Sequence, residues 1–270
     1  MSGRFRILGC GSSGGVPRIG GNWGDCDPSN PKNRRLRSSA MVERWGDDGE
    51  APNATRILID TSPDIRQQLL GADVGKLDAV FFTHDHADHT HGIDDLRVAC
   101  YNAKSRIDTY ASAQTFNMLL SRFGYCFQSP EGSNYPPILD AHQIRPGKTI
   151  AIDGPGGAIS ALPYEQDHGA IRSLGFRFGS LAYSTDVSAL EDEAKAELKG
   201  LDVWIVDALR YTTHPSHFSV DQALEMIDEL KPKRAVLTHL HVDLDYDELN
   251  AYLPDHVEPA YDGMAIDFDL

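Results

Sequence analysis

Cysteines and long apolar runs are scarce in this sequence. Only four of its 270 residues are cysteines (Cys10, Cys26, Cys100 and Cys126), and they are widely spaced without a Cys-x-x-Cys pair. A chain of this size does not need a disulfide framework, so we expect free thiols in a reducing compartment. No apolar run reaches the roughly 18 residues of a membrane span, and the first residues lack the apolar core of a secretion signal. These absences favour a cytoplasmic protein with no membrane association.

Positive charge is also in short supply. The chain has 25 lysines and arginines against 40 aspartates and glutamates, which gives a formal net charge of −15. This excess repels nucleic-acid backbones and argues against broad binding to polyanions. We therefore expect no extended nucleic-acid partner, while a local group of basic residues can still bind one phosphate.

Hydrophobic residues are plentiful, at 41% of the chain, and we find no low-complexity tract and no repeat of fixed period. We expect a single domain over residues 1–270. Short apolar runs recur, several of them followed by helical patterns, which predicts an alternating α/β fold. The predicted strands lie within residues 4–11, 56–64, 77–86, 180–186, 201–209 and 234–241, and the predicted helices at 65–72, about 189–199 and 219–230, the last with Ser219 as its N-cap.

The densest polar stretch is FFTHDHADHTHGIDDLR, residues 81–97, which places four histidines and four aspartates directly behind an apolar run. Residues two apart in an extended segment point the same way, so His84 and His86 can face one ion. Asp88 and His89 follow and can serve a second ion beside it. Imidazoles mixed with a carboxylate suit zinc, manganese or ferrous iron better than calcium.

Four residues cannot complete the ligand sets of two ions, so further ligands must come from distant segments. Alternating α/β folds gather polar residues at the ends of their strands, and His168, Asp186 and His239 each close an apolar segment or lie in a loop beside one. Taken singly, a histidine at a strand end is more often only hydrogen-bonded, but the dense cluster favours the metal interpretation. We predict a pair of divalent ions, zinc or manganese, that shares a hydroxide and clamps the oxygens of a displacement at phosphorus. One ion has His84, His86 and His168 as ligands, the other has Asp88, His89 and His239, and Asp186 bridges the two.

The segment THDHADHTHG resembles the His-x-His-x-Asp-His signature of the metallo-β-lactamase superfamily. The order of that signature followed by His168, Asp186 and His239 is similar to the order of ligands in this family. The resemblance implies an α/β fold, a four-layer αββα sandwich with its metals at one edge between two sheets. The signature is specific for the superfamily and says little about the substrate.

Two further segments resemble one branch of that superfamily. ILGCGSSGGVP (residues 7–17) is similar to the glycine- and serine-rich turn of the phosphodiesterases, which include the phosphoribosyl 1,2-cyclic phosphate phosphodiesterases and, more distantly, the tRNA 3′-processing endonucleases. Asp186 as the bridge also fits this branch, since lactamases have a cysteine there. The chain lacks the long basic arm with which the nucleases hold tRNA, so the resemblance implies a small phosphodiester, cyclic or derived from a nucleotide or sugar.

The segment THPSHFSVDQALEMIDELKPKRAVLTHLH (213–241) looks like the part of these enzymes that contains an extra catalytic histidine, which maps onto His217. Its implied role is to hold a phosphate oxygen or to protonate the leaving group. Asp88 would help to position the hydroxide. His217 can also be read as an ordinary loop residue before a helix, and His214 is the weaker candidate for the same role.

Several residues near the predicted site can have either a functional or an ordinary structural role. Asp60, at a strand end, can accept the second N–H of a ligand histidine or can simply cap a turn. Arg35, within a basic run that also contains Lys32, Arg34 and Arg37, can contact a non-reacting phosphate or remain at the surface. Ser12 and Ser13 can line the pocket or only form a turn.

Several questions stay open at this stage. The cyclic-phosphate enzymes carry a cysteine-rich structural zinc site near the N-terminus, whereas Cys26 is the only cysteine of the corresponding segment, GGNWGDCDPSNP. The same ion pair could serve a thioester or lactam hydrolase, and a nucleotide-binding sensor without turnover is a third alternative. The sequence also leaves a homodimer open.

Overall fold

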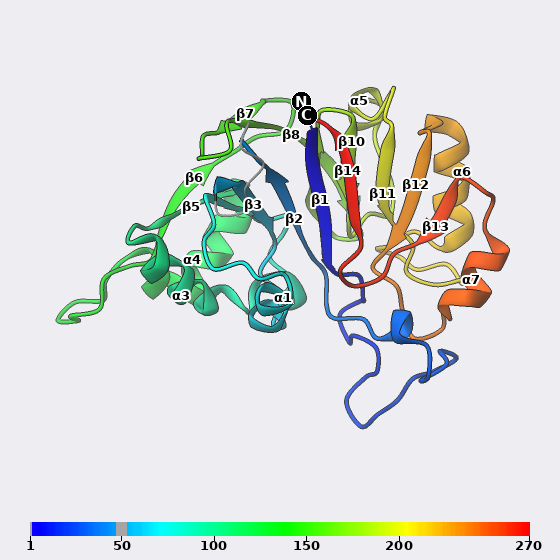
Figure 1. Cartoon of the computed structure of the whole chain (residues 1–270), viewed down its shortest axis with the longest axis horizontal. Helices are drawn as coiled ribbons and strands as arrows, with labels where there is room; N and C mark the ends of the chain where they lie inside the picture. Colours follow the sequence, from blue (N-terminus) through cyan, green and yellow to red (C-terminus); the bar gives the residue numbers. More distant parts are fainter. Residues whose placement is uncertain (1, 47–52) are drawn as a thin grey trace.

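The structure is a computed structural model that describes residues 2–46 and 53–270. In this part of the chain two β-sheets face each other, and helices cover both outer faces (Figure 1). The α/β class and the four-layer αββα arrangement predicted from the sequence are therefore confirmed.

The first sheet is antiparallel on one side and parallel on the other. Strands β3 to β6 run parallel to one another, whereas β14, β1, β2 and β3 alternate in direction. Among the described residues its spatial order is β14 (Ala265–Asp269), β1 (Ser2–Gly9), β2 (Ser39–Arg44), β3 (Thr55–Ile59), β4 (Ala79–Phe81), β5 (Ile107–Ala111) and β6 (Leu139–Gln143).

The second sheet has the same division. Strands β10 to β13 are parallel, and β7 to β10 form an antiparallel series. Its order is β13 (Val257–Pro259), β12 (Arg234–Thr238), β11 (Val203–Asp207), β10 (Leu181–Ser184), β9 (Ile171–Phe178), β8 (Ile159–His168) and β7 (Ile150–Ile152). The carboxyl ends of parallel strands share one edge of a sheet, so polar residues that follow them come together.

The main core fills the space between the sheets. Phe81 of the first sheet packs against Phe176 of the second at 5.1 Å between ring centroids, and Phe5 packs against Tyr183 at 5.3 Å. There are two further apolar layers, one between each sheet and the helices that cover it. A strand covered on both faces must be apolar throughout, which explains the buried run VWIV of β11.

The helices cover the two sheets separately. Helix α6 begins with the predicted N-cap: the Ser219 hydroxyl accepts from the Gln222 backbone, and the Gln222 side chain accepts from Ser219 N–H. The first sheet is covered by α1 (Ile65–Gly71), α3 (Leu96–Ala103) and α4 (Ala113–Phe127), and the second by α5 (Asp192–Glu197), α6 (Val220–Leu230) and α7 (Tyr246–Tyr252). The short elements are η1 (Pro31–Asn33), α2 (Ala87–Thr90) and η3 (Ile93–Asp95).

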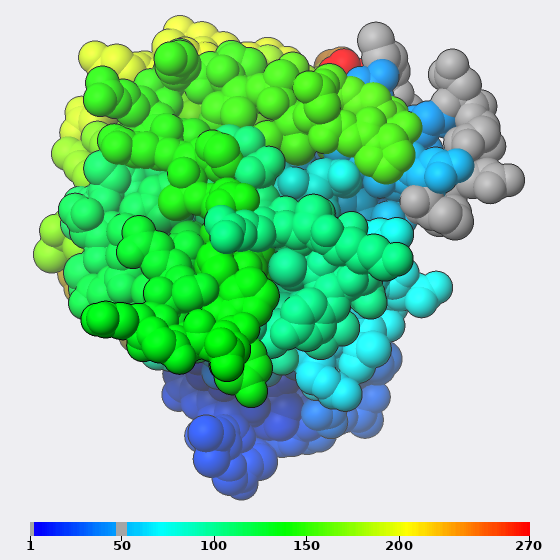
Figure 2. Space-filling view, turned by 90° about the vertical axis from the view of Figure 1, so that its left-hand side faces the viewer, coloured from blue at the N-terminus to red at the C-terminus, as the bar shows by residue number. Residues whose placement is uncertain are grey.

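The loop between β1 and β2 extends beyond the ends of the sheets (Figure 1). Figure 2, which shows the side of the first sheet's helices, displays the blue loop projecting below the remainder of the molecule. Backbone bonds tie the loop to the segment after β12: Ser12 N–H donates to Leu240 O at 3.2 Å, and Asp25 N–H donates to Val242 O at 2.9 Å. The loop therefore links the end of β1 in the first sheet to the segment after β12 in the second. In the described residues, no helix has both the length and the apolar character needed to cross a bilayer.

Candidate metal centre

The His-x-His-x-Asp-His segment begins directly after β4. His84 and His89 are fully buried, His86 is exposed, and the single turn of α2 carries Asp88 and His89 back toward His84. The Nε2 atoms of His84 and His89 are buried and lack a hydrogen-bond partner in the described structure. Buried nitrogens that make no hydrogen bond are costly, so their presence fits a site built to hold an ion.

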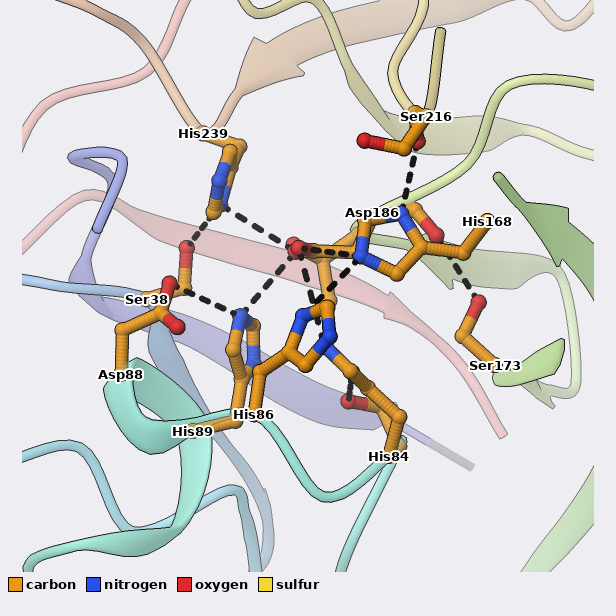
Figure 3. A network of polar contacts seen from close by, with 12 residues as sticks. Ser38, His84, His86, Asp88, His89, His168, Ser173, Asp186, Ser216 and His239 are labelled. Atoms are coloured by element: carbon orange, nitrogen blue, oxygen red, sulfur yellow. Dashed lines mark hydrogen bonds and ion pairs between the residues drawn. The ribbon is translucent and has the colours of Figure 1, made fainter. Parts of the chain in front are cut away.

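Asp186, which follows β10, lies at the centre of the cluster (Figure 3). Its Oδ1 is 3.1 Å from His89 Nε2 and 3.2 Å from His239 Nδ1. On the other side, Oδ2 is 3.7 Å from His84 Nε2 and 3.5 Å from His168 Nε2. One carboxylate thus presents a different oxygen to each of two sets of histidines.

The seven predicted ligands form two groups that share Asp186. In each group the potential ligand atoms lie within 4.8 Å of one another. We call the first the open group, because it includes the exposed His86, and the second the closed group. The open group contains His84, His86, His168 and Asp186, and the closed group contains Asp88, His89, Asp186 and His239.

Charge is distributed between these groups in a way that suits cation binding. Burial alone would raise the pKa of Asp186, but the surrounding imidazoles, His239 and His89 foremost, hold it well below its usual range. Burial lowers the pKa of His84 strongly and that of His239 to about 4, so both imidazoles are neutral near pH 7. Metal binding requires ionised carboxylates and neutral imidazoles, so His84 and His239 are ready to bind, whereas His89, whose pKa the surrounding carboxylates raise, loses its proton when an ion binds.

Three residues at the centre also have an unusual backbone conformation. Asp60, Asp186 and His239 have φ angles of 62°, 53° and 60°, in the left-handed region that non-glycine residues seldom occupy. Each follows a strand of the parallel part of a sheet. Such conformations cost roughly 1–3 kcal/mol and persist where the surrounding structure enforces them, often at functional sites.

Asp60 links the two groups through the ring nitrogens that face away from Asp186. Its Oδ2 accepts His89 Nδ1–H at 2.7 Å and the Thr83 hydroxyl at 2.8 Å. The Thr83 oxygen in turn lies 2.9 Å from His84 Nδ1. The fully buried Asp60 therefore orients a histidine of the closed group directly and one of the open group through Thr83.

The remaining ligands also have outer partners. His168 Nδ1–H donates to Ser216 O at 2.6 Å, on the side of the ring away from Asp186. The Ser38 hydroxyl lies 2.8 Å from His239 Nδ1, the nitrogen that also faces Asp186. The Thr185 hydroxyl donates to Asp186 Oδ1 at 2.7 Å. These contacts restrict the rotation of each ring or carboxylate.

His217 lies between the two groups without belonging to either. Its ring stacks on His239 with centroids 4.8 Å apart and meets His168 edge-on at 4.7 Å. The Nδ1–H donates to Asp207 Oδ2 at 2.7 Å, and Nε2 points toward Asp186 Oδ2 at 3.9 Å. Burial by itself would lower the pKa of His217, but the Asp207 carboxylate outweighs it and raises the pKa to about 9. The ring is thus a cationic donor facing the shared carboxylate.

The residues predicted to contact the substrate do not all lie at the metal centre. Arg35 is only 1% exposed, and its guanidinium donates to His241 O at 3.0 Å and Leu244 O at 2.6 Å. It is committed to the protein interior, so the proposed phosphate contact through Arg35 does not fit the structure. Ser12 is buried in the loop beside Leu240, while Ser13 is exposed.

The other members of the basic run are also engaged. Arg37 forms a bidentate ion pair with Asp64. Lys32 Nζ lies 4.1 Å from the ring centroid of Tyr246, and Arg34 lies over Trp23. His214, the weaker candidate for the catalytic role, has its ring centroid 5.1 Å from that of His217.

Among residues 2–46 and 53–270, no group of potential metal ligands includes Cys26. The two groups above are those found in the described residues, and neither includes Cys26. Its thiol lies within reach of Val242 O at 3.3 Å, Leu244 O at 3.4 Å and Arg35 Nη1 at 3.8 Å. Cys26 is thus held by backbone carbonyls and by the buried guanidinium of Arg35.

Some functional residues were missed by the sequence analysis. Asp207 closes the apolar run of β11, the same signal that pointed to Asp60 and Asp186, so it could have been found. Thr83 directly precedes the signature and could have been considered with it. Ser38 has no distinguishing pattern and becomes visible only through its contact with His239.

Comparison with known proteins agrees with this geometry. A family model described as the beta-lactamase superfamily domain matches residues 55–240. A solved diphosphatase from the PhnP family superposes with a TM-score of 0.86 at 35% identity, covering 99% of this chain and 98% of that chain. Zinc-bound PqqB from Methylobacterium extorquens has a TM-score of 0.72 at 19% identity, with 99% and 100% covered, and so shares the fold.

A curated relative has a different description. The octanoyltransferase of Porphyromonas gingivalis is 33% identical over 266 residues, which are 97% of this chain and 51% of that protein. The chain therefore spans about half the length of this relative. Taken together, the family model, the fold and the two groups of ligands show that the chain belongs to the metallo-β-lactamase superfamily of metal-dependent hydrolases, with a PhnP-family diphosphatase among its relatives.

Proposed function

We propose that the protein is a phosphodiesterase that hydrolyses a small phosphate diester with the help of two divalent metal ions, zinc or manganese. The observation that carries this proposal is the position of Asp186, whose two carboxylate oxygens face the open group and the closed group separately. A shared carboxylate is suited to two adjacent ions. The 35% identity to a diphosphatase supports chemistry at phosphorus.

The chain's own residues would prepare the site for this reaction. The open and closed groups would hold the ions, which when bound make water acidic enough to act as a nucleophile near neutral pH and stabilise charge on the phosphate. Asp88, largely buried beside His89, presents Oδ2 at 3.4 Å from His89 Nε2 and can orient a water next to the shared carboxylate. Asp60 and Ser38 keep the imidazoles in place.

His217 would serve the leaving group. Asp207 holds its Nδ1–H and favours the protonated ring, so that Nε2–H points into the space between the two groups. A positioned imidazolium can neutralise a phosphate oxygen or donate a proton to the departing alkoxide. The ring returns to this form by taking a proton from water after product leaves.

A small substrate is the better match for the net charge. With −15 overall, the molecule would repel a long polyanion at distance, whereas a single diester can be held by local groups. We therefore propose a small phosphate ester as the partner, without an extended nucleic acid.

Hydrolysis of an acyl substrate is the second candidate, favoured by the octanoyltransferase relative. Parallel assays on metal-supplemented protein separate the two. We expect turnover of bis(p-nitrophenyl) phosphate and close to two transition-metal ions per chain by elemental analysis. Turnover of an octanoyl thioester without any turnover of the diester would replace our proposal with the second candidate. Protein that contains no metal after such expression would reject both.

A further inference from the structure

The β8–β9 hairpin contains a buried polar pair beside the ligand His168. His168 ends β8, and Gln166 lies two residues earlier on the same face of that strand. Ser173 of β9 is the partner of Gln166 across the hairpin. Both side chains are fully buried, and neither belongs to the open or the closed group. We call Gln166 and Ser173 the hairpin pair.

The hairpin pair holds the backbone around Asp186 through hydrogen bonds. The Ser173 hydroxyl donates to Asp186 O at 2.8 Å (Figure 3), and Gln166 Nε2–H donates to Thr185 O at 3.0 Å. Gln166 Nε2–H also donates to Ser173 Oγ at 3.1 Å, which leaves the single hydroxyl proton of Ser173 for Asp186. Two consecutive carbonyl groups are thus fixed where the φ angle of Asp186 is 53°. A residue in the left-handed region persists only with such support.

The orientation of the Gln166 amide indicates what this side chain is for. Its Oε1 is buried and has no hydrogen-bond partner among the described residues. Turning the amide over would place Oε1 against the carbonyl of Thr185 and would lose both donations from Nε2. Gly175 leaves room for the observed orientation, because a Cβ there would lie 2.6 Å from Oε1. A buried oxygen without a partner is costly, and the two bonds donated at the Asp186 turn account for it.

The same hairpin holds the start of the His-x-His-x-Asp-His segment. Leu174 N–H, next to Ser173, donates to Thr83 O at 2.9 Å, and Thr83 directly precedes His84. The hairpin therefore carries one member of the open group and is hydrogen-bonded to the segments that carry two more. These three members are His84, His168 and Asp186.

We propose that the hairpin pair positions the open group, so that the affinity of this group for its ion depends on the bonds from Gln166 and Ser173 to the Asp186 turn. The proposal rests on the two-ion site of the proposed function, and the two residues act through the ligands without touching an ion. The closed group is held from the other sheet, because its histidines contact Asp60 and Ser38 beside β3 and β2. Loss of the hairpin pair should therefore weaken the open group more than the closed group, although Asp186 belongs to both.

Zinc titration of two variants tests the proposal. Ser173→Ala removes the hydroxyl that donates to Asp186 O, and Gln166→Met keeps the length of the side chain but removes both amide donations. Metal-free protein is titrated with zinc in competition with a chromogenic chelator, which resolves two dissociation constants. In both variants we expect the weaker constant to rise about 10- to 100-fold, the loss typical of residues that orient a ligand, while the tighter constant stays close to the wild-type value.

Two further variants separate positioning from a general effect on the fold. Thr109→Val removes a fully buried hydroxyl of β5 that donates to Asp140 O at 2.7 Å, and should leave both dissociation constants unchanged. Ser173→Thr retains a hydroxyl and should restore the weaker constant. Denaturant unfolding checks that each variant is folded. If Gln166→Met does not fold, Ser173→Ala, which removes one oxygen, decides the test.

The outcomes distinguish the positioning role from the proposed diesterase activity. Wild-type constants in Ser173→Ala, or an equal rise of both constants, would overturn the positioning role while leaving the diesterase proposal to its own assay. A selective rise of the weaker constant would support the positioning role even if the wild-type protein did not turn over bis(p-nitrophenyl) phosphate.

Discussion

The open and closed groups share Asp186 but are built differently. Every ligand of the closed group is buried or nearly so, His89 has an outer partner in Asp60, and Ser38 contacts His239. The open group includes the exposed His86, whose Nδ1 lies 3.2 Å from His168 Nε2 within the same group. The closed group is thus preorganised, whereas part of the open group faces the solvent.

Their charges differ as well. The closed group has two carboxylates, and these with Asp60 overcome the effect of burial and raise the pKa of His89 well above its usual range, which shows how strongly this position favours positive charge. The open group has three imidazoles and only the shared carboxylate. We expect the closed group to hold its ion more tightly and the open group to exchange its ion and receive the substrate.

The largest effect is expected from Asp186→Ala, because this change removes a ligand from both groups at once. The variant should contain few metal ions and should lose activity on a phosphodiester by at least about 10⁴-fold. Elemental analysis and steady-state assays measure both quantities, with the exposed Asp153→Ala as the matched control. A variant that keeps two ions would show that Asp186 does not serve either group.

His217→Ala should separate catalysis from metal binding. His217 contacts both groups but belongs to neither, so the metal content should match that of the wild-type protein while kcat falls by about 10²–10⁴-fold. Asp207→Asn should produce a smaller decrease in kcat, since the ring remains but loses the carboxylate that favours its protonated form. If His217→Ala instead loses an ion, the histidine is a ligand.

Single substitutions in the two groups should have unequal consequences. His89→Ala should lose the closed-group ion and also unfold more readily, because buried Asp60 loses its imidazole partner, a change worth roughly 3–5 kcal/mol. His86→Ala removes an exposed ring and should lower only the occupancy of the open group. Metal content and denaturant unfolding of the two variants measure the difference, and equal losses would contradict the distinction between the groups.

The smallest effects should come from the outer partners. Asp60→Asn places an amide donor against His89 Nδ1–H, so metal affinity of the closed group should fall about 10- to 100-fold. Thr83→Val removes the hydroxyl between Asp60 and His84 and should weaken mainly the open group, with Thr83→Ser restoring the affinity. Competition with a chromogenic chelator measures both affinities. A uniform loss in both groups after Thr83→Val would mean that Thr83 acts on the fold as a whole.

Much of this centre was predictable because its chemistry is local in the chain. His84, His86, Asp88 and His89 fall within six residues. Strands such as VWIVD and AVLTH are apolar runs that end in polar residues, so the sequence indicates where those polar groups lie. The parallel order of β10, β11 and β12 then brings Asp186, Asp207 and His239 to one edge. His168 was harder to justify from the sequence, since it ends an antiparallel strand whose position depends on its pairing with β9.

The basic run near the N-terminus shows the limit of such reasoning. Lysines and arginines close together suggest a surface that meets phosphate, yet Arg35 is buried against the carbonyls of the segment after β12, more than 200 positions away. Arg18, by contrast, contacts His241, 223 positions away in the chain, and only the fold brings the two together. Composition alone cannot distinguish an arginine that binds a ligand from one that ties two loops.

The amino-acid sequence by itself determined the types of ligand, the strands that carry them and the α/β class, because apolar periodicity and residue chemistry are properties of short segments. The four-layer arrangement followed from the resemblance of the sequence to the metallo-β-lactamase superfamily. Only the tertiary structure decided which oxygen of Asp186 faces which histidines, which imidazoles have a carboxylate behind them, and that Arg35 is buried against backbone carbonyls. These relations depend on distances between segments remote in the chain, and such distances are set by how the two sheets and the loop between β1 and β2 pack together.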